Sequence, residues 1–126
     1  MKLTKTITLY CMLALLGMSL VGCKDKADEN KPMDQVNAEA EKMSVEKLKS
    51  TAMAYKDAIM AKQKDVEKVM AKLKDVPVME AMGEEAKGLK ADIDSLNKSV
   101  SNLKDRFTVY YNKLKEKGGD TSGLDL

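Results

Sequence analysis

Apolar residues recur at alternating spacings of four and three residues between positions 82 and 114. Every position in this series is apolar, and Lys, Asp, Asn and Ser fill the positions between them. Such spacing places the apolar side chains along one stripe of a helix, as in the seam of a coiled coil. We therefore predict a helix over residues 84–117 that ends at Gly118-Gly119. Its seam consists of Met82, Ala86, Leu89, Ile93, Leu96, Val100, Leu103, Phe107, Tyr110 and Leu114.

A less regular heptad pattern precedes the helix predicted over residues 84–117. Residues 34–75 contain no Gly or Pro and are rich in Ala, Lys, Glu and Met, which are good helix formers. The pattern predicts one helix over this range, with Asp34 as its N-cap. Two polar residues, Glu41 and Lys62, interrupt the seam. Each either fixes the register of the helix pair or extends its charged group to solvent. The seam positions are Ala38, Val45, Ala52, Ile59, Val66 and Leu73, with companions Glu41, Leu48, Tyr55, Lys62, Val69 and Val76.

Pro77 separates the two predicted helices and places the turn within residues 75–83. The predicted fold is all-α: a long antiparallel two-helix hairpin, or coiled coil, over residues 34–117. Two registers satisfy the pattern. A tight turn at Pro77 pairs Leu73 with Met82 and Val66 with Leu89. A longer loop instead starts the second helix at Glu84 and Glu85, where carboxylates favour a helix N-terminus, and it pairs Leu48 with Leu114, Ala52 with Tyr110 and Tyr55 with Phe107.

Two methionines widen the apolar face of the first predicted helix. Met53 and Met60 lie beside its seam. They either flank the core of the hairpin or form a surface for a partner or a second copy, because flexible Met side chains adapt well to binding.

The N-terminal segment has the layout of a secretory signal. Lys2 and Lys5 precede an apolar run from Ile7 to Val21, no acidic residue occurs before Cys23, and a small residue precedes that cysteine. Residues 1–22 are therefore predicted to be a signal peptide. The alternative of a transmembrane anchor is less favoured, because the run has about 15 residues and a spanning helix needs roughly 20.

The end of this segment, Leu20-Val21-Gly22-Cys23, resembles the lipobox of bacterial lipoproteins. The resemblance implies that the thiol of Cys23 receives a diacylglycerol, that the preceding bond is cut, and that the new N-terminus is acylated with a chain such as palmitate. The other reading is an ordinary secretory signal with Cys23 present by chance. Lys24, rather than Asp, follows the cysteine, which favours the outer membrane of a bacterial envelope.

Composition removes several classes of function. Loss of Lys2 and Lys5 from the 22 basic residues leaves 20, equal to the 20 acidic ones. Lys residues alternate with Asp and Glu, and the single arginine is Arg106, so a nucleic-acid or phosphate surface is not expected. The chain has no His, and Cys11 is removed with the signal. No catalytic site, metal site or small-molecule substrate is expected, and no cofactor apart from the lipid on Cys23.

The remaining segments are short and polar. Residues 23–33 follow the lipidated cysteine and are expected to be a flexible tether, and residues 118–126 a mobile tail. The whole pattern predicts a membrane-anchored, non-enzymatic envelope lipoprotein that serves as a helical spacer, scaffold or partner-binding rod. Alternatives are a surface-exposed binding or inhibitor module and a chaperone-like periplasmic oligomer. The small helical murein lipoprotein is similar in being a lipidated coiled coil, but this chain has Pro77 midway and ends in Asp125-Leu126 rather than lysine.

Overall fold

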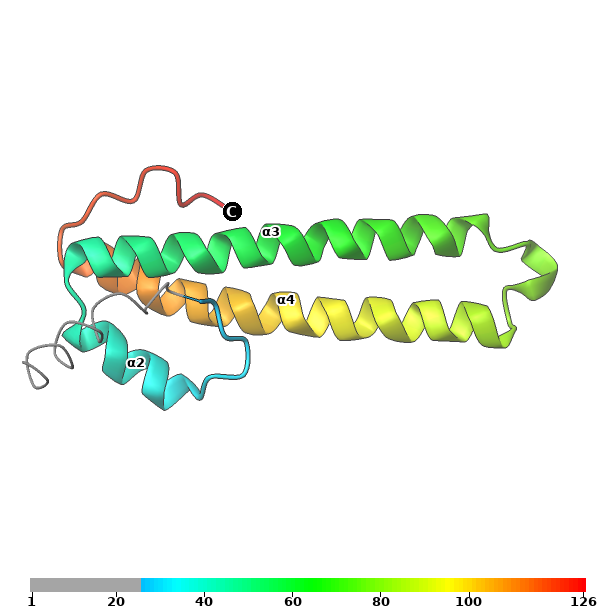
Figure 1. The fold of residues 1–126 in the computed structure, drawn as a ribbon, viewed down its shortest axis with the longest axis horizontal. Coiled ribbons are helices and arrows are strands. Elements are labelled where there is room, and N and C mark those ends of the chain that lie inside the picture. Colours follow the sequence, from blue (N-terminus) through cyan, green and yellow to red (C-terminus); the bar gives the residue numbers. More distant parts are fainter. Residues whose placement is uncertain (1–25) are drawn as a thin grey trace, which may run out of the picture.

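The computed structural model describes residues 26–126, which form a long helical rod (Figure 1). Its helices are α2 (Met33–Lys42), α3 (Val45–Asp75) and α4 (Glu84–Glu116), with a short 3₁₀ turn, η2 (Val78–Glu80), between the last two. Helices α3 and α4 run antiparallel along their length, and α2 packs on α4 at one end of the rod. The described residues contain no strand. The predicted all-α class and antiparallel hairpin are confirmed.

The prediction of one unbroken helix over residues 34–75 is wrong, because the chain turns between α2 and α3. Met43 and Ser44 both have extended backbones, and the Ser44 side chain accepts a hydrogen bond from the backbone N–H of Lys47 at 3.2 Å. This N-cap starts α3 in a new direction. As a result α2 buries a pair of residues outside the expected seam, Val36 and Ala40. The seam positions expected in this stretch, Ala38 and Glu41, are exposed.

The loop between the long helices is the longer of the two alternatives. Helix α3 ends at Asp75, α4 begins at Glu84, and Gly83 is the N-cap residue. Met82, expected in the seam of the second helix, therefore lies in the loop and is exposed. Across the hairpin Tyr55 stacks on Tyr110 with ring centroids 5.3 Å apart.

That stacking lies one helical turn from the pairing of Tyr55 with Phe107 that the longer loop implied. Phe107 instead stacks on Tyr111 of its own helix, with centroids 5.6 Å apart. Both aromatic pairs lie at the same end of the rod as α2. Large aromatic rings are thus concentrated where the most elements meet.

The core occupies one half of the rod. We call the half that carries α2 and both terminal segments the covered half, and residues 62–99 the open half. In the open half only α3 and α4 pack together. The seam positions on these two helices are half-buried there, except Ala86, which is buried. The buried cluster, all in the covered half, consists of Val36, Ala40, Leu48, Ala52, Tyr55, Ile59, Val100, Leu103, Phe107, Tyr110, Leu114 and Leu124.

The C-terminal segment, residues 117–126, folds back along α3 instead of extending as the expected tail (Figure 1). Gly118 has φ +73°, a left-handed conformation suited to glycine, and ends α4. Gly119 follows at a close approach, since a Cβ there would lie 2.8 Å from a methyl of Val45. The segment then buries Leu124 in the core cluster at 1 % exposure.

Candidate anchoring and partner-binding surfaces

The residues of the predicted lipobox, Leu20, Val21, Gly22 and Cys23, lie outside the described residues, as does the predicted signal peptide 1–22. Lipidation of Cys23 therefore stays a prediction. What the structure does describe is the segment that follows the cysteine, from Lys26 onward.

Residues 26–32, which we call the strap, cross the rod and are fastened to it. The hydroxyl of Tyr55 accepts a hydrogen bond from the backbone N–H of Asp28 at 3.2 Å and donates one to the carbonyl of the same residue at 3.1 Å. Tyr55 is itself buried, and Ala27 packs against the core cluster. The expected flexible tether is thus, over residues 26–32, a packed part of the fold, because a buried tyrosine satisfies its backbone.

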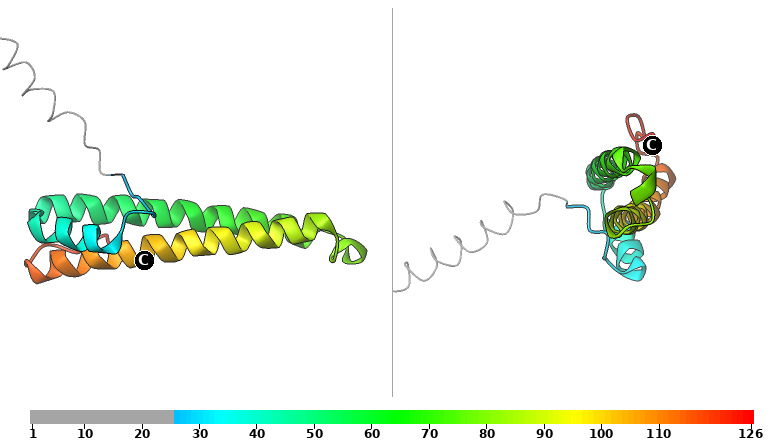
Figure 2. Two further views of the ribbon diagram at one scale, coloured as in Figure 1. Left: turned by 90° about the horizontal axis from the view of Figure 1, so that it is seen from below. Right: turned by 90° about the vertical axis from the view of Figure 1, so that its right-hand side faces the viewer.

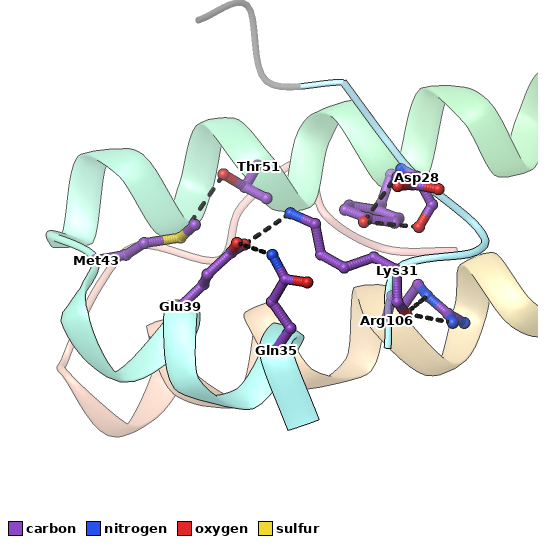
Figure 3. Close-up of polar contacts among 8 residues, drawn as sticks. Asp28, Lys31, Gln35, Glu39, Met43, Thr51 and Arg106 are labelled. Atoms are coloured by element: carbon purple, nitrogen blue, oxygen red, sulfur yellow. Dashed lines mark hydrogen bonds and ion pairs between the residues drawn. The ribbon is translucent and has the colours of Figure 1, made fainter. Parts of the chain in front are cut away.

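Arg106 fastens the other end of the strap (Figure 3). Its Nε and Nη2 atoms donate to the carbonyl of Lys31 at 2.9 and 2.6 Å, and Nη1 donates to the carbonyl of Asn102 at 2.8 Å. The Arg106 side chain is buried at 8 % exposure. The one arginine of the chain therefore serves the backbone, since a guanidinium offers several donors in a fixed geometry.

The Lys31 side chain reaches α2. Its Nζ atom lies 2.7 Å from Glu39, which also accepts a hydrogen bond from Gln35 at 3.1 Å. The hydrogen bond from Lys31 lowers the pKa of Glu39, and the same bond raises the pKa of Lys31. Both shifts favour the charged pair, which joins the strap to α2 (Figure 3).

Tyr110 lies beneath this network. Burial raises the pKa of its hydroxyl well above the usual range, and the charges of Tyr55 and Glu39 act in the same direction. By strict geometry the buried Tyr110 hydroxyl oxygen has no hydrogen-bond partner among the described residues, although Tyr55 and Glu39 lie near enough for weak hydrogen bonding to contribute to the raised pKa. The two stacked tyrosines thus differ, because only the Tyr55 hydroxyl is used to hold the strap.

A hollow of about 520 Å³ opens beside the strap at the middle of the rod. Its walls come from the strap, α3 and α4, and its charged side chains carry both signs. It is lined by Lys26, Ala27, Asp28, Glu29, Asn30, Ala58, Lys62 and Leu103. Lys62, an expected interruption of the seam, thus lies half-buried at the rim of this hollow.

The predicted partner surface, Met53 and Met60, is partly exposed on α3. The two side chains are 41 % and 44 % exposed, on the same side of the helix two turns apart. They remain a candidate surface, although each has more than half of its area covered.

The loop at the end of the open half, which we call the tip, is far more exposed. Val78, Met79 and Met82 are 91 %, 97 % and 84 % exposed. The sequence analysis missed this group because Met82 fitted the seam of the second helix. A signal was present in the sequence, since two methionines and a valine follow Pro77 in a segment that has turn residues at both ends.

The tip itself carries only acidic charges, and exposed lysines of the two long helices border it, among them Lys72 and Lys74 in the last turn of α3. Between Lys74 and Lys87 the chain carries four carboxylates and no basic residue. Two of them, Glu84 and Glu85, lie in the first turn of α4, where they favour the helix N-terminus. Asp75 and Glu80 are also exposed, so the tip combines apolar side chains with an acidic rim.

No protein-family model, no curated protein and no solved structure matches this chain. Within residues 26–126, no group of three or more His, Cys, Asp or Glu side chains is arranged to hold a metal ion. The same part of the chain has no helix with the length and apolar character needed to cross a membrane.

Proposed function

We propose that the protein is a non-enzymatic lipoprotein of the bacterial outer membrane, anchored through acyl chains on Cys23, whose helical rod presents its tip to a protein partner. The lipobox-like residues and the signal-like segment support the anchor. The observation that carries the partner-binding role is the exposure of Val78, Met79 and Met82 at the end of the rod. Large apolar side chains gathered on a surface mark interaction sites.

The acidic rim favours a particular kind of partner. Anionic lipid headgroups repel a segment with four carboxylates, whereas a protein cavity with an apolar interior and a basic rim complements it. Methionine side chains fill irregular cavities well. The tip therefore suits an envelope protein with such a cavity.

The anchor is tested by metabolic labelling with a radioactive or clickable palmitate. We expect label on the wild-type protein and none on Cys23→Ser, which keeps the rest of the chain. Wild-type protein should sediment with membranes and the variant should not. Equal labelling of both proteins contradicts the anchor.

The partner role is tested with a photo-crosslinking amino acid at position 79 in living cells. A matched control carries the same amino acid at position 64, exposed on α3. We expect a discrete crosslinked species from position 79 only. It should weaken when Val78 and Met82 become serine, and when Glu80 and Glu84 become lysine.

These substitutions leave the fold intact as a control. All four side chains are exposed, so the serine pair should change the free energy of unfolding by less than about 0.5 kcal/mol. The lysine pair should lower it by about 1 kcal/mol, because Glu84 lies in the first turn of α4, where a carboxylate is favourable. Crosslinking that is identical at positions 79 and 64, or that survives both sets of substitutions, contradicts a partner site at the tip.

A further inference from the structure

The strap and α2 together form an arm, residues 26–42, that folds back onto the rod. Helix α2 packs on α4, and seen along the rod from the tip, α4 lies between α3 and α2 (Figure 2). Val36 and Ala40 of α2 belong to the core cluster. The arm is thus held by the contacts of α2 with α4 and by the bonds of the strap to Tyr55 and Arg106. Its covalent link to α3 is the turn at residues 43–44.

This turn is held by side-chain hydrogen bonds. The Ser44 side chain accepts one from the backbone N–H of Lys47 at 3.2 Å, and Lys117 Nζ donates to the carbonyls of Glu41 and Met43 at 2.9 and 2.7 Å. Residues 33–75 contain no Gly or Pro. A straight helix through the turn would have four backbone bonds instead, from the N–H groups of residues 44–47 to the carbonyls of residues 40–43. Opening the turn therefore exchanges one set of hydrogen bonds for another.

The direction of α2 decides what an opened arm can bind. Arg106 of α4 binds Lys31, just before α2, and Lys113 of α4 pairs with Glu41 near the end of α2. Helix α2 therefore runs parallel to α4, whereas α3 runs antiparallel to it. If the turn straightens, α2 continues the line of α3 past the end of the rod and leaves its place on its own α4.

A second copy of the chain supplies the surface that the opened arm has left. A two-fold axis across the α2 end of the rod reverses the direction of α4 in the second copy, so that this α4 runs parallel to the straightened α2. The arm then meets the same residues as before, Tyr55, Arg106 and Lys113, in the other copy. Because the exchange is reciprocal, it closes at two copies and leaves no arm site empty.

We infer that the arm has a second partner site, the α4 of another copy of this chain, and that the protein forms a dimer in which the two arms are exchanged. The two rods meet at their α2 ends, and their tips lie at opposite ends of the dimer. Each α4 has 33 residues and is about 50 Å long, so the tips stand about 100 Å apart. The exchange requires neither the anchor on Cys23 nor a partner at the tip.

Crosslinking between two copies tests the exchange. Two differently tagged full-length chains, one with Glu41→Cys and the other with Lys113→Cys, are produced in the same cells and treated with a short bismaleimide. Within one copy the two positions meet in the same chain, so a crosslink between the two tags reports an exchanged arm. We expect such a heterodimer. The control pair is Glu41→Cys with Glu80→Cys at the tip, which should give only background.

Two substitutions of Ser44 separate the exchange from simple contact between rods. Both remove the cap hydroxyl, but only Ser44→Ala is compatible with a straight helix. Proline suits the closed turn, because Ser44 has φ −69° and Met43 before it is extended. We expect Ser44→Ala to raise the crosslinked heterodimer about fivefold, the usual effect of losing an N-cap, and Ser44→Pro to lower it to the background of the control pair.

A chain that carries both Glu41→Cys and Lys113→Cys completes the test. It should crosslink internally, in the Ser44→Pro background as well, which shows that the arm still folds onto α4. Absence of this internal crosslink from the otherwise wild-type chain overturns the inference, because α2 would then not pack on α4. A heterodimer that stays at background in both wild type and Ser44→Ala, or equal heterodimer in Ser44→Ala and Ser44→Pro, also overturns it.

Discussion

At the scale of single residues, the stacked pair Tyr55 and Tyr110 shows how one side-chain type takes two roles. Both rings fill the core between α3 and α4. The Tyr55 hydroxyl also serves both backbone groups of Asp28, whereas the Tyr110 hydroxyl is buried without a hydrogen-bond partner among the described residues. Because a buried polar group gains stability only when it is well paired, we expect the Tyr55 hydroxyl to contribute more to stability than the Tyr110 hydroxyl.

Removing each hydroxyl tests this difference. Tyr55→Phe leaves the strap without its two hydrogen bonds and should lower the free energy of unfolding by about 1–2 kcal/mol. Tyr110→Phe should leave it unchanged or raise it by up to about 1 kcal/mol, because an unpaired buried oxygen is removed. Urea denaturation of both variants measures the two values. Equal losses would show that Tyr110 has a hydrogen-bond partner in solution.

Residue roles were the least predictable part of the molecule. The heptad pattern placed Tyr55, Leu103 and Leu114 in the core, where they are buried. It could not show that Tyr55 and Arg106 hold the strap, because their partners are backbone groups 27 and 75 residues away in the chain. Backbone acceptors look alike in every sequence, so no pattern of residue types reveals such contacts.

At the scale of elements, the two terminal segments stabilise the rod although neither is helical. The strap packs in the covered half with Ala27 against the core, and the C-terminal segment packs along α3 with Leu124 in the core. Lys49 pairs with Asp120 at 2.6 Å, and Lys56 donates to the carbonyl of Gly123 at 2.7 Å. Long-range contacts of this kind anchor segments whose local sequence would otherwise stay unfolded.

The C-terminal segment offers an internal control. Leu124→Ala removes a buried side chain and should cost about 2–3 kcal/mol in the free energy of unfolding. Leu126→Ala, at a side chain that is 60 % exposed, should cost less than about 0.5 kcal/mol. Chemical denaturation followed by circular dichroism compares them. If the two variants are equally stable, the segment does not pack in solution.

Helix positions were predictable from sequence to different degrees. The spacing of four and three identified α4 within one or two residues at its ends, and the C-terminal end of α3 is at the expected Asp75. The break at Met43-Ser44 was not predicted, since neither residue prevents helix formation. Ser44 is a favourable N-cap residue and caps α3, but serine also occurs inside helices, so the sequence did not show that the chain turns there. The burial of Val36 and Ala40 accompanies the turn and depends on tertiary packing.

At the scale of the whole molecule, ion pairs connect the covered half across elements. Lys31 joins the strap to Glu39, Lys113 joins α4 to Glu41, and Lys49 joins α3 to Asp120. In each case a hydrogen bond from lysine is the main cause that lowers the pKa of the carboxylate. The pairs are partly exposed, so salt weakens them. Their effect is a modest dependence of stability on pH.

The sign of that dependence follows from the lowered pKa values. A carboxylate whose pKa is lower in the folded state stabilises the fold above its unfolded pKa, and this contribution is lost as pH falls through the folded pKa. The melting temperature should therefore decrease on acidification below about pH 4. Thermal melts between pH 7 and 2.5 measure the decrease. The decrease in melting temperature should be smaller in Glu39→Gln, which lacks the titrating carboxylate. The control is Glu67→Gln, at an exposed position in the open half, where the decrease should be larger. Equal decreases in the two variants would contradict this role of the ion pair.

The strap has a mechanical consequence. Tension applied to the chain before Lys26 acts first on the hydrogen bonds to Tyr55 and Arg106, and not on the pairing of α3 with α4. Release of residues 26–32 lengthens the connection by about 20–25 Å while the long helices stay paired. Under tension, a rod attached in this way releases the strap and so lengthens its connection. The strap can bind to the rod again when the tension ends. We therefore expect the strap to act as a reversible extension of the connection.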